Sequence, residues 1–191
     1  NRIQASELQD KGVLANCHVN VLQTQDHPQF KTYSEELKWL TTDKTRMKWV
    51  ANTIKDISSS GNTLILVDRI SAGEILEEQI EDAVFVSGST KNTDRKEQYD
   101  EISTATNKVI IATYGVAAVG INIPRIFNLV LIEPGKSFVR VIQSIGRGIR
   151  KAEDKDSVQI WDITSSCKFA KRHLGARKKF YKEANYPYNI E

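Results

Sequence analysis

The stretch Thr63–Ile80, "TLILVDRISAGEILEEQI", contains the pattern on which the fold of this chain depends. Thr63–Val67 is a short run of mostly apolar residues, which predicts a buried strand. Ser71 follows, with Glu74 three residues later, and this pair indicates a capping box at the start of a helix. The stretch therefore predicts one strand followed by one helix.

The same strand–helix unit recurs along the chain. Further apolar runs predict strands at His18–Leu22, Ala83–Val86, Lys108–Thr113, Phe127–Ile132 and Val158–Ile163. Helices are expected at Ser34–Leu40, from Asp43 to the Ser-Ser-Ser-Gly61 stop, and at Thr93–Ile102, Ser137–Arg150 and Cys167–Ala184. This alternation is typical of an α/β fold with a mostly parallel sheet and helices on both faces. We expect residues 1–42 to form a lead and connector with the first strand, and residues 43–191 the main domain, within one compact unit.

The composition is that of an ordinary globular domain, with 40% hydrophobic and 27% charged residues among 191. No apolar run approaches the ~18 residues that a membrane span requires, and the first residues do not resemble a signal peptide. Cys17 and Cys167 are too few for a disulfide framework, so a reduced, cytoplasmic location is expected. Cys17 and His18 are adjacent, but two ligands without a second pair favour packing over metal binding, and we expect no metal site.

Positive charge is concentrated at the C-terminal end. Residues 1–139 carry 15 Lys and Arg against 18 Asp and Glu, a net charge of −3, whereas residues 140–191 carry 12 against 6, a net charge of +6. This distribution suits a partner with phosphates, and equally a solvated helix face. The last helix has the same two interpretations: its basic residues track DNA phosphates, or the helix packs through Phe169, Leu174 and Phe180 and solvates its lysines.

Gly135-Lys-Ser137 stands between a predicted strand and a predicted helix, where a phosphate-binding loop would lie. The full pattern G-x-x-x-x-G-K-[ST] requires a glycine at position 130, which is Val130. Pro134 also removes a backbone donor. We therefore interpret Ser137 as a helix cap. Asp68 and Asp162 each end an apolar strand, as a magnesium ligand would, but without a phosphate loop we interpret both as structural.

A second phosphate-binding candidate follows in Gln143-x-x-Gly-Arg147-x-x-Arg150. The spacing of four and three residues places these three side chains on one face of a helix. Two neighbouring guanidinium groups repel each other unless an anion or water lies between them, and their planar donors suit a polyphosphate.

The run Val109–Thr113 leads into a loop of small residues that contains Gly120 and Asn122. The hydroxyl of Thr113, the backbone amides and the Asn122 amide are suited to a nucleic-acid phosphate or a nucleotide sugar. A plain strand–loop turn is the alternative.

These motifs resemble those of a known family. "IIATYGVAAVGINIP" and "QSIGRGIR" resemble motifs V and VI of superfamily-two helicases, and the two occur in the same order, separated by one strand. "TLILVDRISAGEIL" resembles motif IV, and "VFVSGSTKNTDR" the segment that follows it. The resemblance runs from Asp43 to Ile163 and is strongest to the second, RecA-like motor domain of phage recombination helicases.

The resemblance implies roles for particular residues. Arg150 would be the arginine finger, Arg147 a second γ-phosphate contact, and Gln143 a link between nucleotide and domain interface. Nucleotide contacts are implied for Gly120 and Asn122, and nucleic-acid contacts for Thr113, Ser87, Gly88 and Arg69. Many relatives have aspartate where Asn122 stands, and the motif V loop is one residue longer than in some, which leaves Thr113 and Tyr114 as alternative phosphate contacts.

The implied function is that of the C-terminal motor domain of an ATP-dependent DNA helicase or translocase that unwinds or remodels branched nucleic acid. ATP with Mg²⁺ would be held mainly by the first RecA-like domain, which this sequence does not contain. The expected partners are that domain and DNA, or RNA–DNA hybrids, with no membrane, and the isolated fragment should be inactive. The alternatives are an ATP-independent nucleic-acid-binding or annealing module, and a small nucleotide kinase built on Lys136.

Overall fold

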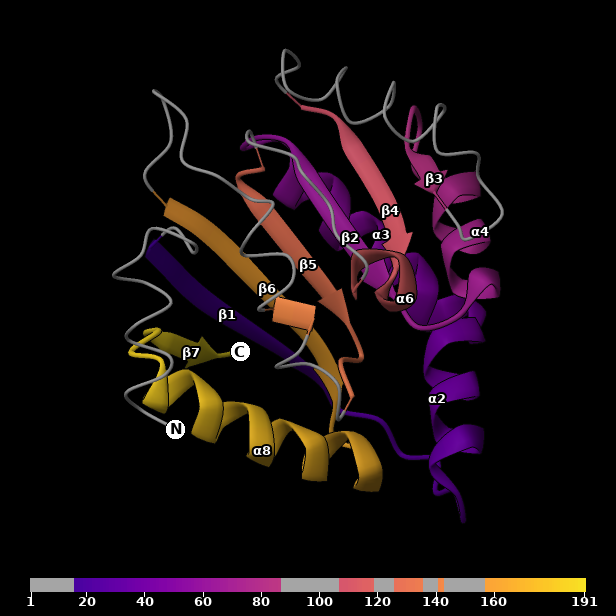
Figure 1. Ribbon diagram of the computed structural model, residues 1–191. Coiled ribbons are helices and arrows are strands. Elements are labelled where there is room, and N and C mark those ends of the chain that lie inside the picture. Colours follow the sequence, from indigo (N-terminus) through magenta and orange to yellow (C-terminus); the bar gives the residue numbers. More distant parts are fainter. Residues whose placement is uncertain (1–15, 87–106, 119–125, 136–140, 143–156) are drawn as a thin grey trace.

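A single parallel sheet organises the chain. The computed structural model describes residues 16–86, 107–118, 126–135, 141–142 and 157–191 (Figure 1). Within these residues the sheet has seven strands in the order β3-β4-β2-β5-β6-β1-β7, and every neighbouring pair is parallel. The strands are β1 (Asn16–Thr24), β2 (Thr63–Val67), β3 (Val84–Val86), β4 (Val109–Thr113), β5 (Asn128–Ile132), β6 (Ser157–Ser165) and β7 (Tyr188–Ile190). The described helices are α2 (Tyr33–Thr42), α3 (Lys44–Ser58), α4 (Ile70–Gln79), α6 (Tyr114–Ala118) and α8 (Lys168–Glu183).

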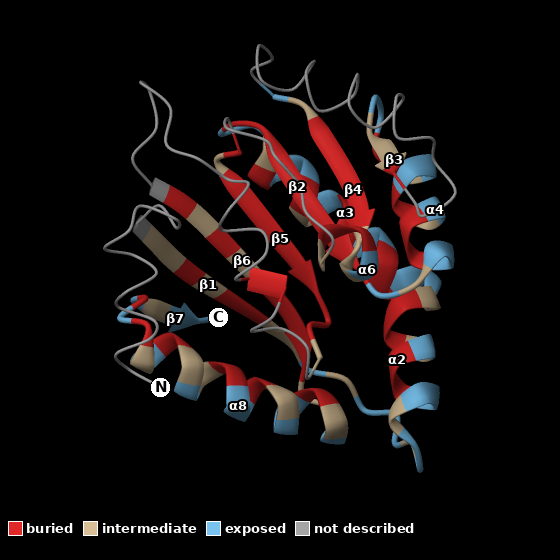
Figure 2. Ribbon diagram, in the orientation of Figure 1, coloured by how far each residue is buried: buried red, intermediate tan, exposed pale blue. Residues whose placement is uncertain are grey.

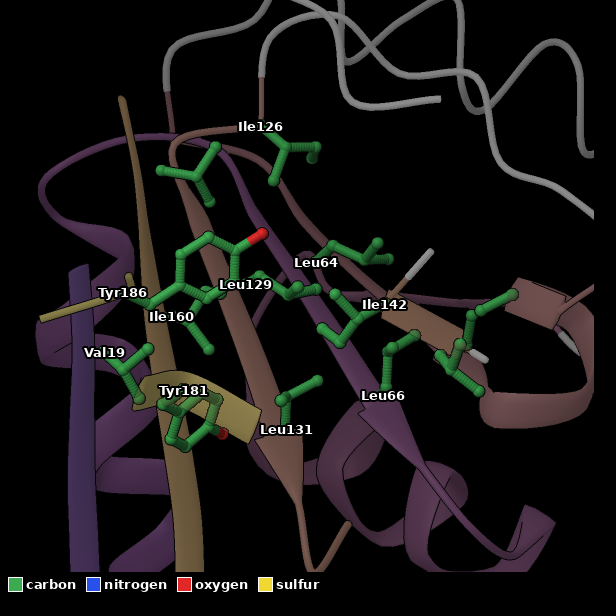
Figure 3. Packing of buried hydrophobic residues seen from close by; sticks show 14 of the residues in the cluster. Val19, Leu64, Leu66, Ile126, Leu129, Leu131, Ile142, Ile160, Tyr181 and Tyr186 are labelled. Carbon is green, nitrogen blue, oxygen red and sulfur yellow. The ribbon is translucent and has the colours of Figure 1, made fainter. Parts of the chain in front are cut away.

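Alternating side chains of the central strands supply a core on each face of the sheet. In β2, Leu64 and Leu66 point to one face, while Ile65 and Val67 point to the other. The second face is covered by the apolar sides of α3 and α4. The first face is covered by α8 and α6, with Val141 and Ile142 also buried there (Figures 2 and 3). The predicted α/β fold with helices on both faces is confirmed.

Several local predictions are also confirmed. Asp43 caps α3, because its carboxylate accepts a hydrogen bond from the backbone N–H of Arg46 at 3.0 Å. The strand β2 has the predicted bounds, and α8 follows Cys167 as expected. The expected helix at Thr93–Ile102 and most of the one at Ser137–Arg150 lie outside the described residues; Val141 and Ile142 are helical.

The capping box at Ser71 and Glu74 was a wrong prediction. The helix α4 begins at Ile70, and its N-cap is Arg69, which makes no capping bond through its side chain. The backbone N–H of Gly73 already bonds to the carbonyl of Arg69, so Ser71 lies inside the first turn. The strand ends at Val67, and a connection of two residues is enough to start the helix.

Two further elements differ from expectation. Tyr114–Ala118, predicted as part of an open loop, forms the short helix α6 directly after β4. The strand β7 was not predicted; its three residues pair with β1, which lies between β6 and β7 in the same sheet. A three-residue strand shows too little periodicity to be recognised without its partner strand.

Candidate nucleotide and nucleic-acid interface

The carboxyl ends of the strands lie at one edge of the sheet because all strands are parallel. The register places Val67 at the end of β2 beside Thr113 at the end of β4. Ile132 at the end of β5 lies beside Ile163 of β6, and Ile132 is followed by Glu133 and Pro134. In α/β sheets, ligands bind at this edge, where the loops leave the strands. Two of the predicted nucleic-acid contacts thus lie at the same edge: Thr113 ends β4, and Arg69 follows the adjacent strand β2 by two residues.

Thr113 is half-buried, and its hydroxyl has a defined role in the backbone. Its Oγ1 accepts a hydrogen bond from the N–H of Val116 at 3.2 Å and so caps α6. A hydroxyl that accepts from a backbone N–H retains its proton for donation. Tyr114, the alternative phosphate contact, instead donates its hydroxyl to the carbonyl of Ile132 at 3.0 Å. Burial raises its pKa well above the ordinary value, with the charge of Asp162 adding to the effect. The geometry therefore favours Thr113 over Tyr114 as a phosphate donor.

Arg69 is held at the sheet edge by α2. Its Nη2 donates to Oγ of Ser34 at 3.2 Å, and its Nε lies 3.7 Å from the Asp68 carboxylate. The side chain remains 34% exposed, so the guanidinium is still accessible to a phosphate. The other predicted site residues lie outside the described residues; these are Ser87, Gly88, Gly120, Asn122, Gln143, Arg147 and Arg150.

Asp162 belongs to a buried ion pair beneath this edge. Arg177 of α8 donates to both of its carboxylate oxygens, Nε at 2.7 Å and Nη2 at 2.9 Å, and Tyr181 donates its hydroxyl at 2.7 Å. Asp162 has no exposed surface. Its oxygens are occupied by protein donors and unavailable to Mg²⁺, so its interpretation as structural is confirmed.

Arg177 also bonds, through Nη1, to the segment that precedes motif VI in the chain. Its Nη1 bonds to the carbonyl of Pro134 at 2.7 Å. Burial lowers the pKa of Arg177, but Asp162 outweighs this effect and leaves it raised. The ion pair therefore joins β6 and α8 to the turn after β5.

A second buried group surrounds Glu133. Its carboxylate bonds to Arg46 of α3 and accepts from the hydroxyl of Thr164 at 3.2 Å. Arg46 also donates to the carbonyl of Leu40 at 2.7 Å and lies 3.6 Å from Asp26. Burial raises the pKa of Glu133 from 4.5 to about 7, against the opposing effects of Arg46, Arg177 and Thr164. A carboxyl group poised to titrate near neutrality thus lies directly before Pro134.

We expect Glu133→Gln to change how stability depends on pH. The folded state holds the proton of Glu133 more tightly than the unfolded state, so this contribution is fully present below pH 4.5 and is lost as pH rises to about 7. A shift of this size corresponds to about 3 kcal/mol. The free energy of unfolding of the variant, relative to the natural chain, should therefore increase between pH 5 and pH 8, as measured by urea titration.

Glu35→Gln, a change of an exposed carboxylate on α2, is the matched control, and its difference from the natural chain should stay nearly constant over this range. Parallel stability curves for Glu133→Gln and the natural chain would contradict the prediction.

Sequence analysis did not single out Arg46, Glu133 or Arg177, although a signal was present. Arg177 occupies a position in the buried stripe of α8, between Leu174 and Tyr181 at helical spacing. Arg46 directly precedes the buried Met47. A charged residue at a position that periodicity assigns to the core indicates a buried ion pair, but its partner cannot be read from the same helix.

The described residues contain no cluster of metal ligands and no membrane-spanning helix. His18 contacts Asn189, with Nε2 and Oδ1 2.9 Å apart. Within the described ranges, no three His, Cys, Asp or Glu side chains are grouped as metal ligands would be. None of the described helices combines the length and apolar character needed to cross a bilayer.

Comparison with known families identifies the class of domain. The helicase conserved C-terminal domain family matches residues 45–152, which include both the Thr113–Pro124 and the Gln143–Arg150 motifs. The chain belongs to this family, as the superfamily-two motifs predicted.

Two curated relatives are viral. The ATP-dependent DNA helicase UvsW of Enterobacteria phage T4 is 27% identical over 195 residues, covering 96% of this chain and 39% of the relative. Putative helicase 22 of Sulfolobus islandicus filamentous virus (isolate Iceland/Hveragerdi) is 30% identical over 137 residues, covering 70% of this chain and 24% of the relative. The chain spans less than half the length of either relative.

Solved structures support the same fold. The crystal structure of T4 UvsW superposes with a TM-score of 0.80 at 22% identity, over 92% of this chain and 41% of that one. The C-terminal domain of the DEAD-box protein Dbp5 gives a TM-score of 0.60 at 17% identity, over 93% of this chain and 92% of that domain. The RecA-like fold is thus shared with part of the UvsW chain and with the C-terminal domain of Dbp5.

Proposed function

We propose that this chain is the C-terminal motor domain of an ATP-dependent DNA helicase or translocase that unwinds or remodels branched nucleic acid in recombination, repair or replication. The observation that carries the proposal is the family match over residues 45–152, because this range contains both candidate motifs. The similarity to UvsW, itself described as an ATP-dependent DNA helicase, supports DNA as the substrate.

The structure supports a nucleotide site that is shared between two domains. Val130, where a phosphate loop would need its first glycine, is fully buried in β5 and paired with β2 and β6. Asp162, the second candidate magnesium ligand, is occupied by Arg177. The residues present thus fit a domain that contacts ATP from one side, while Mg²⁺ and the triphosphate are held mainly by another RecA-like domain.

In this proposal, Arg150 and Arg147 stabilise the charge that develops on the transferred phosphoryl group, and Gln143, Gly120 and Asn122 contact the nucleotide. Because these residues lie on a different domain from the phosphate loop, they act only when the cleft between domains closes. Thr113, Arg69, Ser87 and Gly88 hold the nucleic-acid backbone. Alternating closure and opening then moves the two domains along the strand.

The isolated chain should release phosphate from ATP at no more than the background rate, even with saturating DNA, whereas the parent protein should show DNA-stimulated hydrolysis. A continuous phosphate-release assay on both proteins tests this difference. Robust phosphate release by the isolated chain would overturn the proposal. A parent protein that anneals strands without hydrolysing ATP would favour the ATP-independent module.

A further inference from the structure

The outer side of α8 carries a row of positive charge. Its buried side consists of Ala170, Leu174, Arg177 and Tyr181. By helical spacing, five exposed cations lie on the opposite side: Lys168, Lys171, Arg172, Lys179 and Lys182. Figure 2 shows the exposed segments along the outer side of α8. From Lys168 to Lys182 the row is about 21 Å long, at 1.5 Å per residue. The helix therefore separates an apolar, ion-paired side that anchors it from a basic side that faces solvent.

The row places like charges close together on α8. Lys168 lies three residues from Lys171 and four from Arg172, and like charges at these spacings repel each other. Within the described residues, none of the five cations forms an ion pair. A polyanion lying along the helix would remove the repulsion.

The binding element would be the side of the helix and not its N-terminus. The buried carboxylate of Glu36 accepts hydrogen bonds from the backbone N–H groups of Phe169 at 2.9 Å and Ala170 at 2.8 Å. These donors are thus already occupied by α2. In the middle of the row, a Cβ at Gly175 would have no atom within 4 Å, and Ala176 is also exposed. Small residues between the two groups of cations leave room for a phosphate backbone to approach closely.

The aromatic rings of α8 indicate which form of nucleic acid would fit. Single-strand sites combine cations with exposed rings on which bases stack. Here Tyr181 is fully buried, and Phe180 packs edge-on against Tyr181 and Tyr186. Phe169 is partly buried and lies beside Tyr33, and its ring is covered by Lys168 at 5.3 Å and by Arg172 at 5.6 Å. The exposed row consequently offers charge with little stacking surface, which matches the paired strands of a duplex.

We propose that the basic side of α8 binds the sugar–phosphate backbone of duplex DNA. The choice of DNA as the polymer rests on the proposed function, whereas the phosphate chemistry rests on α8 itself. At about 3.4 Å per base pair, the row spans about six base pairs. This duplex-binding surface on α8 is additional to the nucleic-acid contacts expected at the sheet edge.

The test replaces Lys171, Lys179 and Lys182 together by glutamine in the full parent protein, without ATP. Binding of a labelled duplex of about 20 base pairs is measured by fluorescence anisotropy at several salt concentrations. Loss of three phosphate contacts should reduce the slope of log K against log salt by about 2.7, and affinity at about 50 mM salt by tenfold or more. Replacement of the same lysines by arginine should preserve binding.

The matched control replaces three exposed lysines of α3, on the opposite face of the sheet: Lys44, Lys48 and Lys55. Equal losses of affinity in the two triple variants would overturn the proposal, because they would reflect net charge alone. A loss confined to single-stranded oligonucleotide would also overturn it. If the triple variant fails to fold by circular dichroism, the single variant Lys179→Gln decides, with an expected slope change of about 0.9. ATP hydrolysis does not enter this measurement, so a parent protein without ATPase activity would contradict the proposed function only.

Discussion

Replacement of Arg150 by alanine in the parent protein is expected to lower the DNA-stimulated kcat of ATP hydrolysis by about 10³–10⁵-fold. The arginine finger meets negative charge that develops only in the transition state, so its loss affects turnover far more than ATP binding. Phosphate release at saturating ATP and DNA measures the change. Arg150→Lys should recover little, because an ammonium lacks the planar set of donors.

Lys136→Ala is the control for Arg150→Ala. It removes the lysine of the Gly135-Lys-Ser137 sequence and should leave kcat nearly unchanged, because that sequence lacks the first glycine of a phosphate loop. A large loss with Lys136→Ala and a small loss with Arg150→Ala would reverse the assignment of the two candidates. DNA binding that falls with Arg150→Ala while hydrolysis persists would instead favour the ATP-independent module.

Replacement of Asp162 by alanine is expected to destabilise the fold by about 3–5 kcal/mol, because it leaves the buried guanidinium of Arg177 without its counter-charge. The free energy of unfolding from urea titration measures the loss. The double variant Asp162→Leu/Arg177→Met should recover much of it, since neither buried charge then remains. If the Asp162 variants do not fold, Tyr181→Phe, which removes only one hydrogen bond to the carboxylate, should cost about 1–3 kcal/mol.

Asp68→Ala provides the comparison at the surface. The Arg69 Nε lies 3.7 Å from the Asp68 carboxylate, with Asp68 exposed and Arg69 partly exposed, and a surface pair of this kind contributes about 0–1 kcal/mol. A loss with Asp162→Ala no larger than that with Asp68→Ala would show that the buried pair does not anchor α8. Such a result would also weaken the proposal that the basic side of α8 binds duplex DNA, because that proposal depends on a fixed orientation of the helix.

Much of the fold was predictable because its signals are local. The strand Thr63–Val67 and the helix after Asp43 follow from apolar spacing and from a capping residue within a few positions. The failures arose where a local signal competed with the tertiary structure. Ser71 and Glu74 satisfy the capping pattern, but the short connection from β2 starts α4 earlier. Tyr114–Ala118 is helical because the Thr113 hydroxyl caps it and Tyr114 bonds back to Ile132.

The candidate site was predictable as a set of motifs, because superfamily-two helicases combine residue type and order in a recognisable way. The sequence left Thr113 and Tyr114 as alternative phosphate contacts, and only the structure shows that the Tyr114 hydroxyl is bonded to the carbonyl of Ile132 in β5. The two interpretations of the last helix likewise required the structure. The structure confirms that α8 packs through its buried side, where Leu174 is buried while Phe169 and Phe180 are only partly buried. Exposed lysines lie on the other side of the helix.

The sequence by itself determined the class of fold, the family and the residues proposed to meet ATP, because apolar periodicity and motif order are properties of neighbouring positions. Only the tertiary structure decided the order of the strands and the pairing of Arg177 with Asp162 and of Arg46 with Glu133. The members of each pair come from separate elements of the chain, and burial makes each charge depend on its partner. Such contacts exist only once the sheet has brought distant segments together, so no local pattern encodes them.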